Sequence, residues 1–315
     1  MITYIIRRIL MTIPILIGIS IISFGIMQFA PGEPTVIGID PNISPEDREA
    51  MMEELGLDDP AHIQYVRWMG DILQGDLGNS FITNRPVSTM IAERLPNTLI
   101  LMLASTIMAI VVAIPFGIIS AMRQYSKIDY TVTFVSFMGL AAPNFWIGLI
   151  LVMILSVQLG WFPVGGVGTL GAEFDILDRL HHLILPAFVL GTAEMAGLTR
   201  YTRTSMIDVK NQDYIRTARA KGFKERKVVY KHALRNALLP LITIFGLMLP
   251  VFIGGSVVVE QIFNWPGLGS LLLEATHQRD YPLVMSLTMI GAVLVVLGNL
   301  IADILYAIVD PRIEY

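Results

Sequence analysis

The amino-acid sequence predicts an all-α polytopic membrane protein with six transmembrane helices. Of its 315 residues, 54% are hydrophobic and only 15% are charged, and the mean hydropathy is +0.64, which is too apolar for a soluble globular chain. Apolar runs alternate with polar stretches, and each run approaches or exceeds the roughly 20 residues that a helix needs to cross the hydrocarbon core. One polar stretch, residues 200–240, is strongly basic and predicts the orientation.

The basic stretch from Arg200 to Pro240 contains eleven of the chain's 22 Lys and Arg residues but only three acids. Positive charge concentrated between membrane spans marks a cytoplasmic loop. With six spans both termini are then expected in the cytoplasm, and sixteen of the 22 basic residues fall on that side. The protein is therefore expected in the cell membrane, as a multi-pass protein.

The first span is predicted over residues 9–30, an uncharged run that follows Arg7 and Arg8. It is longer than the apolar core of a signal peptide, which has about 7 to 15 residues. Residues 1–30 are therefore expected to form a cytoplasmic end and a retained first transmembrane helix.

Residues 31–95 turn polar and acidic and are expected to form an extracytoplasmic region with short helices. A helix is predicted from Ser44 to about Leu55, ending at Gly56, because Ser-Pro-Glu-Asp is a helix-start pattern. A second, amphipathic helix is predicted over residues 61–73, either on the outer membrane surface or against the spans.

The remaining five spans belong to one predicted transmembrane domain, residues 96–309, which is followed by a short cytoplasmic C-terminus at 310–315. Proline is expected to kink the second span at Pro115 and to interrupt the third at Pro143, because proline lacks the N–H of an intrahelical bond. These spans are predicted at residues 96–122, 130–159, 181–200, 238–259 and 283–302.

Within the basic loop, taken as residues 200–237, the stretch from Asp213 to Leu234 is predicted to form two helices separated at Gly222, a residue suited to ending a helix. The small residues Ala218 and Ala220, flanked by basic side chains, suit a surface that is received in a groove of another protein. The alternative is that the basic residues only fix the topology and contact anionic lipid. Composition alone does not decide between the two.

A series of short motifs spread over the whole chain shares its order and spacing with a known family. The motifs are DYIRTARAKG and KHALRNALLP in the loop, YIIRR at 4–8, APGEP at 30–34, ELGL at 54–57, GDLG at 75–78, RLPNTL at 94–99, LPAFVLG at 185–191, VVVEQIFNWPGLG at 257–269, RDYP at 279–282 and DPRIEY at 310–315. In these motifs the chain resembles the B-type permease subunits of oligopeptide and dipeptide ABC importers, above all oligopeptide permeases of the Bacillus type.

The resemblance implies a type I ABC importer permease fold that shares a pore with a C-type permease subunit. Two ABC ATPase subunits and an extracytoplasmic peptide-binding protein are the other implied partners, with membrane lipid around the subunit and no nucleic acid. The implied function is transport of oligopeptides or dipeptides by alternating access. This chain is then no enzyme and binds no cofactor, since ATP and Mg bind to the partner ATPases. Import of nickel, glutathione or oligosaccharide by the same architecture is an alternative.

The same resemblance makes the first helix of the loop a coupling helix that docks into a cleft of one ATPase. The chain departs from the general importer motif Glu-Ala-Ala…Gly, because Arg216 stands in place of the Glu and Thr217 in place of the first Ala. The residues assigned to ATPase coupling are Arg216, Thr217, Ala218, Arg219, Ala220, Lys221 and Gly222.

Three polar residues are candidates for the translocation path: Glu194, Asn144 and Glu260. Glu194 lies about mid-way along the fourth span, where an ionised carboxylate is costly unless it faces water or a partner. It would contact the amino group or a basic side chain of a passing peptide. The structural alternatives are an ion pair with Arg200 or Arg203, or a protonated acid.

The other two candidates also have structural interpretations. Asn144 follows a proline and would face the pore, or, more simply, satisfy the carbonyl group that the proline frees. Glu260, at the outer end of the fifth span, would contribute to an external gate or a binding-protein contact, or anchor the helix at the interface.

The sequence lacks the residues that several other classes of function require. The absence of cysteine excludes disulfides, thiolate metal sites and cysteine nucleophiles. The adjacent His181 and His182 cannot supply the i and i+4 ligands of a helical metal site, and only Asp178 is close to them, so no metal site is expected. No G-x-S-x-G or H-E-x-x-H motif occurs. An ion-coupled secondary transporter would need its own relay, for which only Glu194 and Asp303 qualify.

Overall fold

The structure, a computed structural model, describes residues 2–29, 58–238 and 256–309, together with residues 46, 52 and 56. Named elements in this part of the chain are all helices, and the only pairing of extended backbone within it is an isolated bridge between Asn79 and Pro86. The predicted all-α class is thus confirmed. The chain divides into two compact units, unit 1 with Leu99–Trp265 and Leu297–Tyr315, and unit 2 with Ile2–Thr98 and Pro266–Val296.

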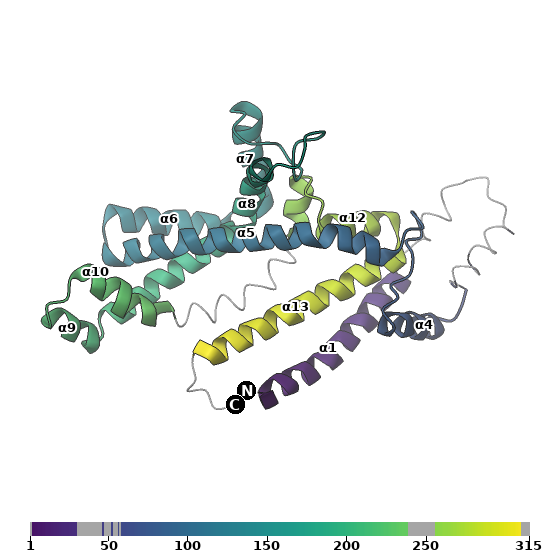
Figure 1. Cartoon of the computed structure of the whole chain (residues 1–315), viewed down its shortest axis with the longest axis horizontal. Helices are drawn as coiled ribbons and strands as arrows, with labels where there is room; N and C mark the ends of the chain where they lie inside the picture. Colours follow the sequence, from purple (N-terminus) through teal and green to yellow (C-terminus); the bar gives the residue numbers. More distant parts are fainter. Residues whose placement is uncertain are drawn as a thin grey trace. The chain divides into compact units, whose positions relative to one another are not determined.

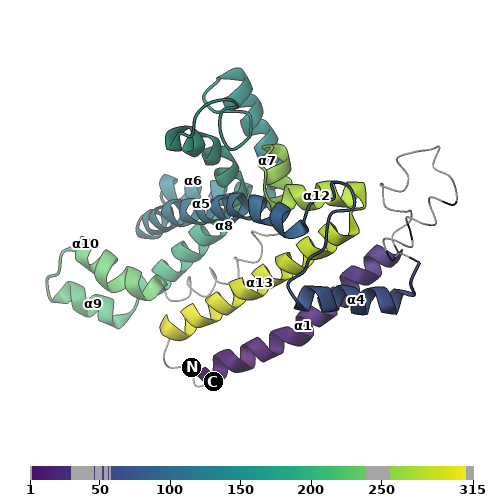
Figure 2. The same cartoon turned by 45° about the vertical axis from the view of Figure 1, so that its right-hand side comes forward.

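Unit 2 contains the amphipathic helix predicted at residues 61–73, which is present with those bounds as α4 (Ala61–Leu73). It lies beside the C-terminal half of α1 (Ile2–Phe29) in Figures 1 and 2. The ring of Phe24 on α1 lies 5.5 Å from that of Tyr65 and 6.4 Å from that of Trp68 on α4. Aromatic packing of this kind fixes one face of α4 against the first span.

A second core of unit 2 joins the start of α5 (Val87–Met122) to α12 (Leu268–Gln278) and the start of α13 (Tyr281–Val309). Its buried members are Val87, Ile91, Leu268, Leu271, Ala275, Leu283, Val284 and Leu287. The helix predicted at 44–55 lies outside the described residues, apart from residues 46 and 52, which are helical.

Four described helices are long and apolar enough to cross a membrane, and a bent pair of helices makes a fifth candidate. Helices α1 and α13 confirm the predicted first and sixth spans. The fifth predicted span, residues 238–259, lies largely outside the described residues. The four helices are α1, α5, α8 (Ile176–Lys210) and α13.

Two predicted spans have different ends in the structure. Helix α5 begins at Val87, nine residues before the predicted boundary at residue 96, and α8 continues to Lys210, ten residues beyond Arg200. Both predicted spans lie within these helices, so the difference concerns where the helices end and not which residues can span the membrane. Apolar composition marks the residues that suit hydrocarbon, whereas a helix continues beyond them as long as packing supports it. Met206, in the extension of α8, is fully buried.

The predicted interruption of the third span at Pro143 is confirmed. Helix α6 (Lys127–Ala141) ends there, and α7 (Asn144–Leu151) continues directly into the π-helical segment η1 (Val152–Gln158). The combined segment Asn144–Gln158 is bent by 106° relative to α6. Ala142 is extended, with ψ of 131°, because a residue before proline is sterically excluded from the helical region. The pair is either a broken span or a re-entrant segment.

Helix α8 is the most buried of the four candidate spans among the described residues. In its apolar window 72% of residues are buried, compared with 6% to 28% in the other three candidate spans. Helix α6 packs against it. Gly117 of α5 permits a close approach, because a Cβ atom there would lie 2.5 Å from Cβ of Thr202 on α8.

A buried ion pair joins α6 to α8. The guanidinium group of Arg203 donates to both carboxylate oxygens of Asp129, at 2.7 and 2.9 Å. The hydroxyl group of Ser120, on α5, and the backbone N–H of Tyr125 also donate to this carboxylate. The carboxylate of Asp129 therefore connects three helices of unit 1. The capping-box spacing Ser126-x-x-Asp129 was a signal for the position of this acid, but not for its distant partner.

Candidate functional sites in the basic loop and along helix α8

The basic loop folds as two helical arms, as predicted. The first arm is α9 (Asp213–Ala220), and the second combines α10 (Glu225–Lys227) with the π-helical segment η2 (Val228–Ala233) and continues as helix to residue 238. Gly222 lies between the arms with φ of +75°. This left-handed conformation suits glycine, which has no Cβ atom to clash with the backbone.

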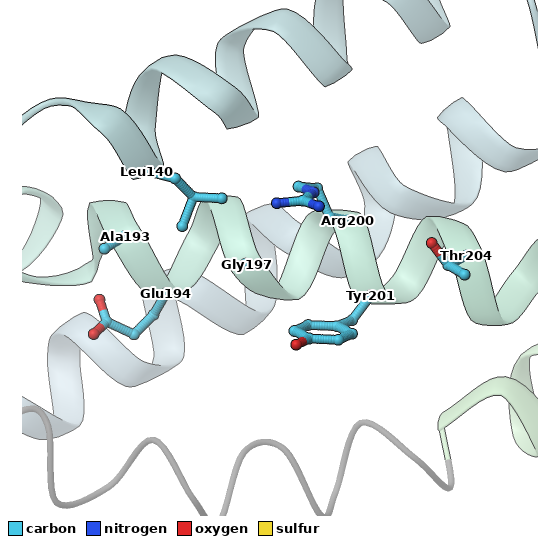
Figure 3. A pocket seen from close by; sticks show the side chains of 7 residues that line it. All are labelled: Leu140, Ala193, Glu194, Gly197, Arg200, Tyr201 and Thr204. Atoms are coloured by element: carbon cyan, nitrogen blue, oxygen red, sulfur yellow. The ribbon is translucent and has the colours of Figure 1, made fainter.

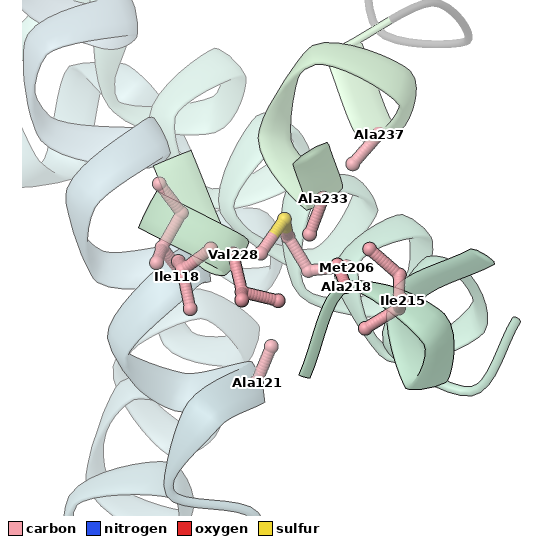
Figure 4. Close-up of a cluster of buried hydrophobic side chains, with 9 residues drawn as sticks. Ile118, Ala121, Met206, Ile215, Ala218, Val228, Ala233 and Ala237 are labelled. Atoms are coloured by element: carbon pink, nitrogen blue, oxygen red, sulfur yellow. The ribbon is translucent and has the colours of Figure 1, made fainter. Parts of the chain in front are cut away.

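An apolar cluster fixes α9 to the spans (Figure 4). Ile215 and Ala218, three residues apart and thus on one side of α9, both point into it. The other members come from the second arm, from α8 and from α5, so that α9 is held by direct packing to helices of unit 1. The buried members are Ile118, Ala121, Met206, Ile215, Ala218, Val228, Val229, Ala233 and Ala237.

Six of the seven residues assigned to coupling are exposed, either on the outer face of α9 or, for Lys221 and Gly222, in the turn that follows it; the exception is Ala218. That side chain is only 6% exposed and faces the apolar cluster, so its assignment to a docking surface stays a prediction that the burial does not support. The helical period places it with Ile215 on the inner face, a signal that the sequence already contained. The exposed residues are Arg216, Thr217, Arg219, Ala220, Lys221 and Gly222.

Arg219 is not a free charge on this face. Its guanidinium group donates to both carboxylate oxygens of Glu225, at 2.8 and 3.2 Å, and so connects α9 to α10. These hydrogen bonds lower the pKa of the Glu225 carboxyl group below its usual value. Among the described residues, the guanidinium group of Arg216, by contrast, forms an ion pair with the highly exposed Asp213 alone, at 3.4 Å. Arg219 therefore positions the two arms, and Arg216 and Lys221 supply the accessible charge of α9.

A cavity of about 450 Å³ lies along α8 in unit 1 (Figure 3). Glu194 is 7% exposed in its wall, and its atom Oε2 has no hydrogen-bond partner among the described residues. The predicted structural pairing with Arg200 or Arg203 is not found: the guanidinium group of Arg203 binds Asp129, and that of Arg200 lies 4.6 Å from the centre of the Phe137 ring. The cavity is lined by Leu140, Ala193, Glu194, Gly197, Arg200, Tyr201 and Thr204.

Asn144 and Glu260 are not part of this cavity. Asn144 is the first residue of α7. Within the described chain its side-chain amide forms no hydrogen bond, so the predicted bond to the carbonyl group that Pro143 frees is not observed. Glu260, in the helical residues 256–262, is completely buried and is therefore inaccessible to a binding protein in this conformation.

The two adjacent histidines have structural contacts. Atom Nε2 of His181 lies 2.7 Å from the carbonyl oxygen of Trp161, and Nδ1 of His182 lies 3.4 Å from the carboxylate of Asp178. Asp178 also accepts hydrogen bonds from the backbone and the hydroxyl group of Thr169. Across the residues that the structure describes, no three potential ligand side chains are grouped to hold a metal ion.

Two family models together match most of the chain. Residues 113–315 match the model described as "Binding-protein-dependent transport system inner membrane component", which covers more than half of the sequence. Residues 1–102 match "Binding-prot-dependent transport system membrane comp, N-term". The basic loop and the cavity along α8 both lie within the first match.

Curated relatives match over the full length. "Oligopeptide transport system permease protein AppB" of Bacillus subtilis is 68% identical over 316 residues, which cover 100% of each chain. "Dipeptide transport system permease protein DppB" of Alkalihalophilus pseudofirmus is 40% identical over 333 residues, again with full coverage of both chains. The Escherichia coli K12 protein of the same name is 37% identical, covering 100% of this chain and 99% of its own.

One similar solved structure is titled "Inward facing conformations of the MetNI methionine ABC transporter: CY5 native crystal form". It has a TM-score of 0.58 and 16% sequence identity, and the match covers 71% of this chain and 97% of that one. At this identity the likeness concerns the fold alone.

Proposed function

Because this chain belongs to the family of binding-protein-dependent transport system inner membrane components, we propose that it is the transmembrane permease subunit of an ATP-driven importer of oligopeptides or dipeptides. The chain has the fold of a type I ABC importer permease. The proposal that the cargo is a peptide rests on the full-length similarity to relatives named for oligopeptide and dipeptide transport. These names favour peptides over nickel, glutathione or oligosaccharide.

The proposed assembly contains a C-type permease subunit, two ABC ATPase subunits and an extracytoplasmic peptide-binding protein. Large exposed apolar side chains on α5 and α6, such as Leu103, Val111 and Phe134, support a surface covered by lipid and a second membrane subunit. ATP and Mg bind to the ATPase subunits, and this chain contributes no catalytic group.

The basic loop is the proposed link to an ATPase. The exposed face of α9, with Arg216, Thr217 and Ala220, docks into the ATPase, while the buried face is packed against α8 and α5. Closure of the ATPases on ATP then moves α9 as a rigid body. Because its inner face is part of the same core as α8, the movement passes directly into the spans. Alternating access follows, with peptide received from the binding protein and released on the cytoplasmic side.

The test uses the complete transporter in proteoliposomes, with import of a labelled peptide and ATP hydrolysis as readouts. Ala220→Glu places a charge on the exposed tip of α9 and is expected to lower binding-protein-stimulated ATP hydrolysis and import about tenfold or more, the effect of one unpaired charge in an interface. Asn236→Glu introduces the same side chain at an exposed position on the second arm and serves as the matched control.

Two results would contradict the proposal. Wild-type activity for Ala220→Glu would show that α9 is not the docking element. If the wild-type complex imported none of the peptides that its binding protein delivers, the assignment of peptide cargo would be wrong.

A further inference from the structure

Three residues form a stripe along one side of α8. Glu194, Gly197 and Tyr201 have the spacing i, i+3 and i+7, which places them on the same face of a helix. All three line the cavity of about 450 Å³. In Figure 3 the side chains of Glu194 and Tyr201 lie on the same side of the ribbon, with the tyrosine hydroxyl directed toward Glu194, whereas Arg200 lies on the other side.

The carboxylate of Glu194 has a buried oxygen atom without a partner in the described part of the chain. Neither nearby arginine forms an ion pair with the Glu194 carboxylate, since Arg200 stacks on Phe137 and Arg203 binds Asp129. The sequence of residues 239–255, which the structure does not describe, contains no Lys, Arg or His. A carboxylate in a membrane span is stabilised by a cationic partner or by water. Among the described residues, the Glu194 side chain therefore has no cationic partner.

We propose that the Glu194–Gly197–Tyr201 stripe binds the protonated amino group and adjoining backbone of the peptide as it crosses the membrane. This inference rests on the proposed function and narrows its cargo to peptides with a free, cationic amine. Glu194 accepts hydrogen bonds from the ammonium group. Gly197 lets the peptide backbone approach α8, since glycine has no side chain to keep it away, and the Tyr201 hydroxyl donates to a peptide carbonyl or carboxylate group.

The dimensions of the stripe fit a short peptide. Glu194 and Tyr201 are seven residues apart, a rise of about 10 Å along a helix. An extended peptide of three residues spans about 10 Å. The cavity volume also lies within the range of about 300 to 1,000 Å³ that is typical of small-molecule sites. A metal ion fits less well, because hard cations need about six oxygen ligands and the described residues offer no grouped ligand set.

The test measures tri-alanine import and binding-protein-stimulated ATP hydrolysis in the same proteoliposomes, which contain the complete transporter. Glu194→Gln is expected to lower the amount of tri-alanine imported per ATP about tenfold or more, the effect of losing one charge-assisted hydrogen bond. The rate of binding-protein-stimulated ATP hydrolysis is expected to stay within about twofold of the wild-type rate. Glu194→Asp keeps the charge and restores part of the import. Glu274→Gln, at an exposed acid on α12, is the matched control.

Three outcomes would overturn the inference. Unchanged import per ATP in Glu194→Gln would mean that the side chain acts as a neutral group. A loss of assembly with the partner subunits in both Glu194→Gln and Glu194→Asp would assign Glu194 to the fold. A wild-type complex that hydrolyses ATP but imports no tri-alanine would instead refute the proposed peptide cargo, and the inference with it. The wild-type measurement therefore separates failure of the function from failure of the site.

Discussion

At the scale of single residues, two buried acids of unit 1, Asp129 and Glu194, have opposite environments. The carboxylate of Asp129 accepts hydrogen bonds from two nitrogen atoms of the Arg203 guanidinium group, from the Ser120 hydroxyl group and from a backbone N–H. Glu194 has an oxygen atom that none of the described residues binds. A buried carboxylate with a full set of donors supports structure, whereas one with an unused oxygen atom is available to a ligand.

The Asp129–Arg203 pair gives a prediction at this scale. Arg203→Met leaves the Asp129 carboxylate buried, at 3% side-chain exposure, without its cation. Removing one partner of a fully buried pair costs about 3 to 5 kcal/mol; because the Arg203 side chain is 26% exposed, the cost here should be smaller, but the melting temperature of the purified subunit in detergent should still fall clearly. Arg67→Met breaks the exposed pair with Asp59, at 2.7 Å, and should cost less than about 1 kcal/mol. Equal shifts for the two variants would contradict a structural role for the buried pair.

At the scale of elements, α9 has two distinct faces, and this arrangement suits the proposed coupling role of the loop. The inner face, with Ile215 and Ala218, belongs to the same core as α5 and α8, and the outer face is polar and exposed. The Arg219–Glu225 ion pair and the turn at Gly222 then fix the angle between the arms. A helix on a flexible tether would absorb a push from a partner, whereas a packed helix transmits it.

The turn at Gly222 can be tested by a substitution pair. Its φ of +75° is tolerated by asparagine but is strained for a β-branched residue by about 1 to 3 kcal/mol. Gly222→Val should therefore disorder the loop and reduce the ATP hydrolysis stimulated by the binding protein, while Gly222→Asn should retain most of it. Gly70→Ala, within α4, provides a control, because no atom lies within 4 Å of a Cβ atom at that glycine. Similar activity of the valine and asparagine variants would show that the turn conformation is not required.

At the scale of the whole molecule, the central question is which side of the membrane each loop faces. The absence of cysteine makes the chain suited to labelling at introduced cysteines. Lys221→Cys, in the basic loop, should react with a membrane-impermeant maleimide only in inside-out vesicles. Leu170→Cys, at a fully exposed position between η1 and α8, should react only in intact cells. The reverse pattern would contradict the orientation that the positive-inside rule predicts.

The sequence by itself determined the features that depend on local chemistry. Apolar runs of span length predicted the helices α1 and α13, an amphipathic period predicted α4 with its observed bounds, and Pro143 predicted the break between α6 and α7. Each of these follows from residues close together in the chain, because hydrophobic periodicity and backbone stereochemistry are short-range properties.

Only the tertiary structure decided which polar side chains have hydrogen-bond or ion-pair partners and which helix faces are buried. Arg203 lies 74 positions from Asp129 in sequence, and their pairing removed Arg203 as a partner for Glu194. The apolar cluster around Met206 extended α8 beyond the predicted span. Both outcomes arise from contacts between distant segments, which no local pattern encodes, since a side chain's partner is set by how the helices pack.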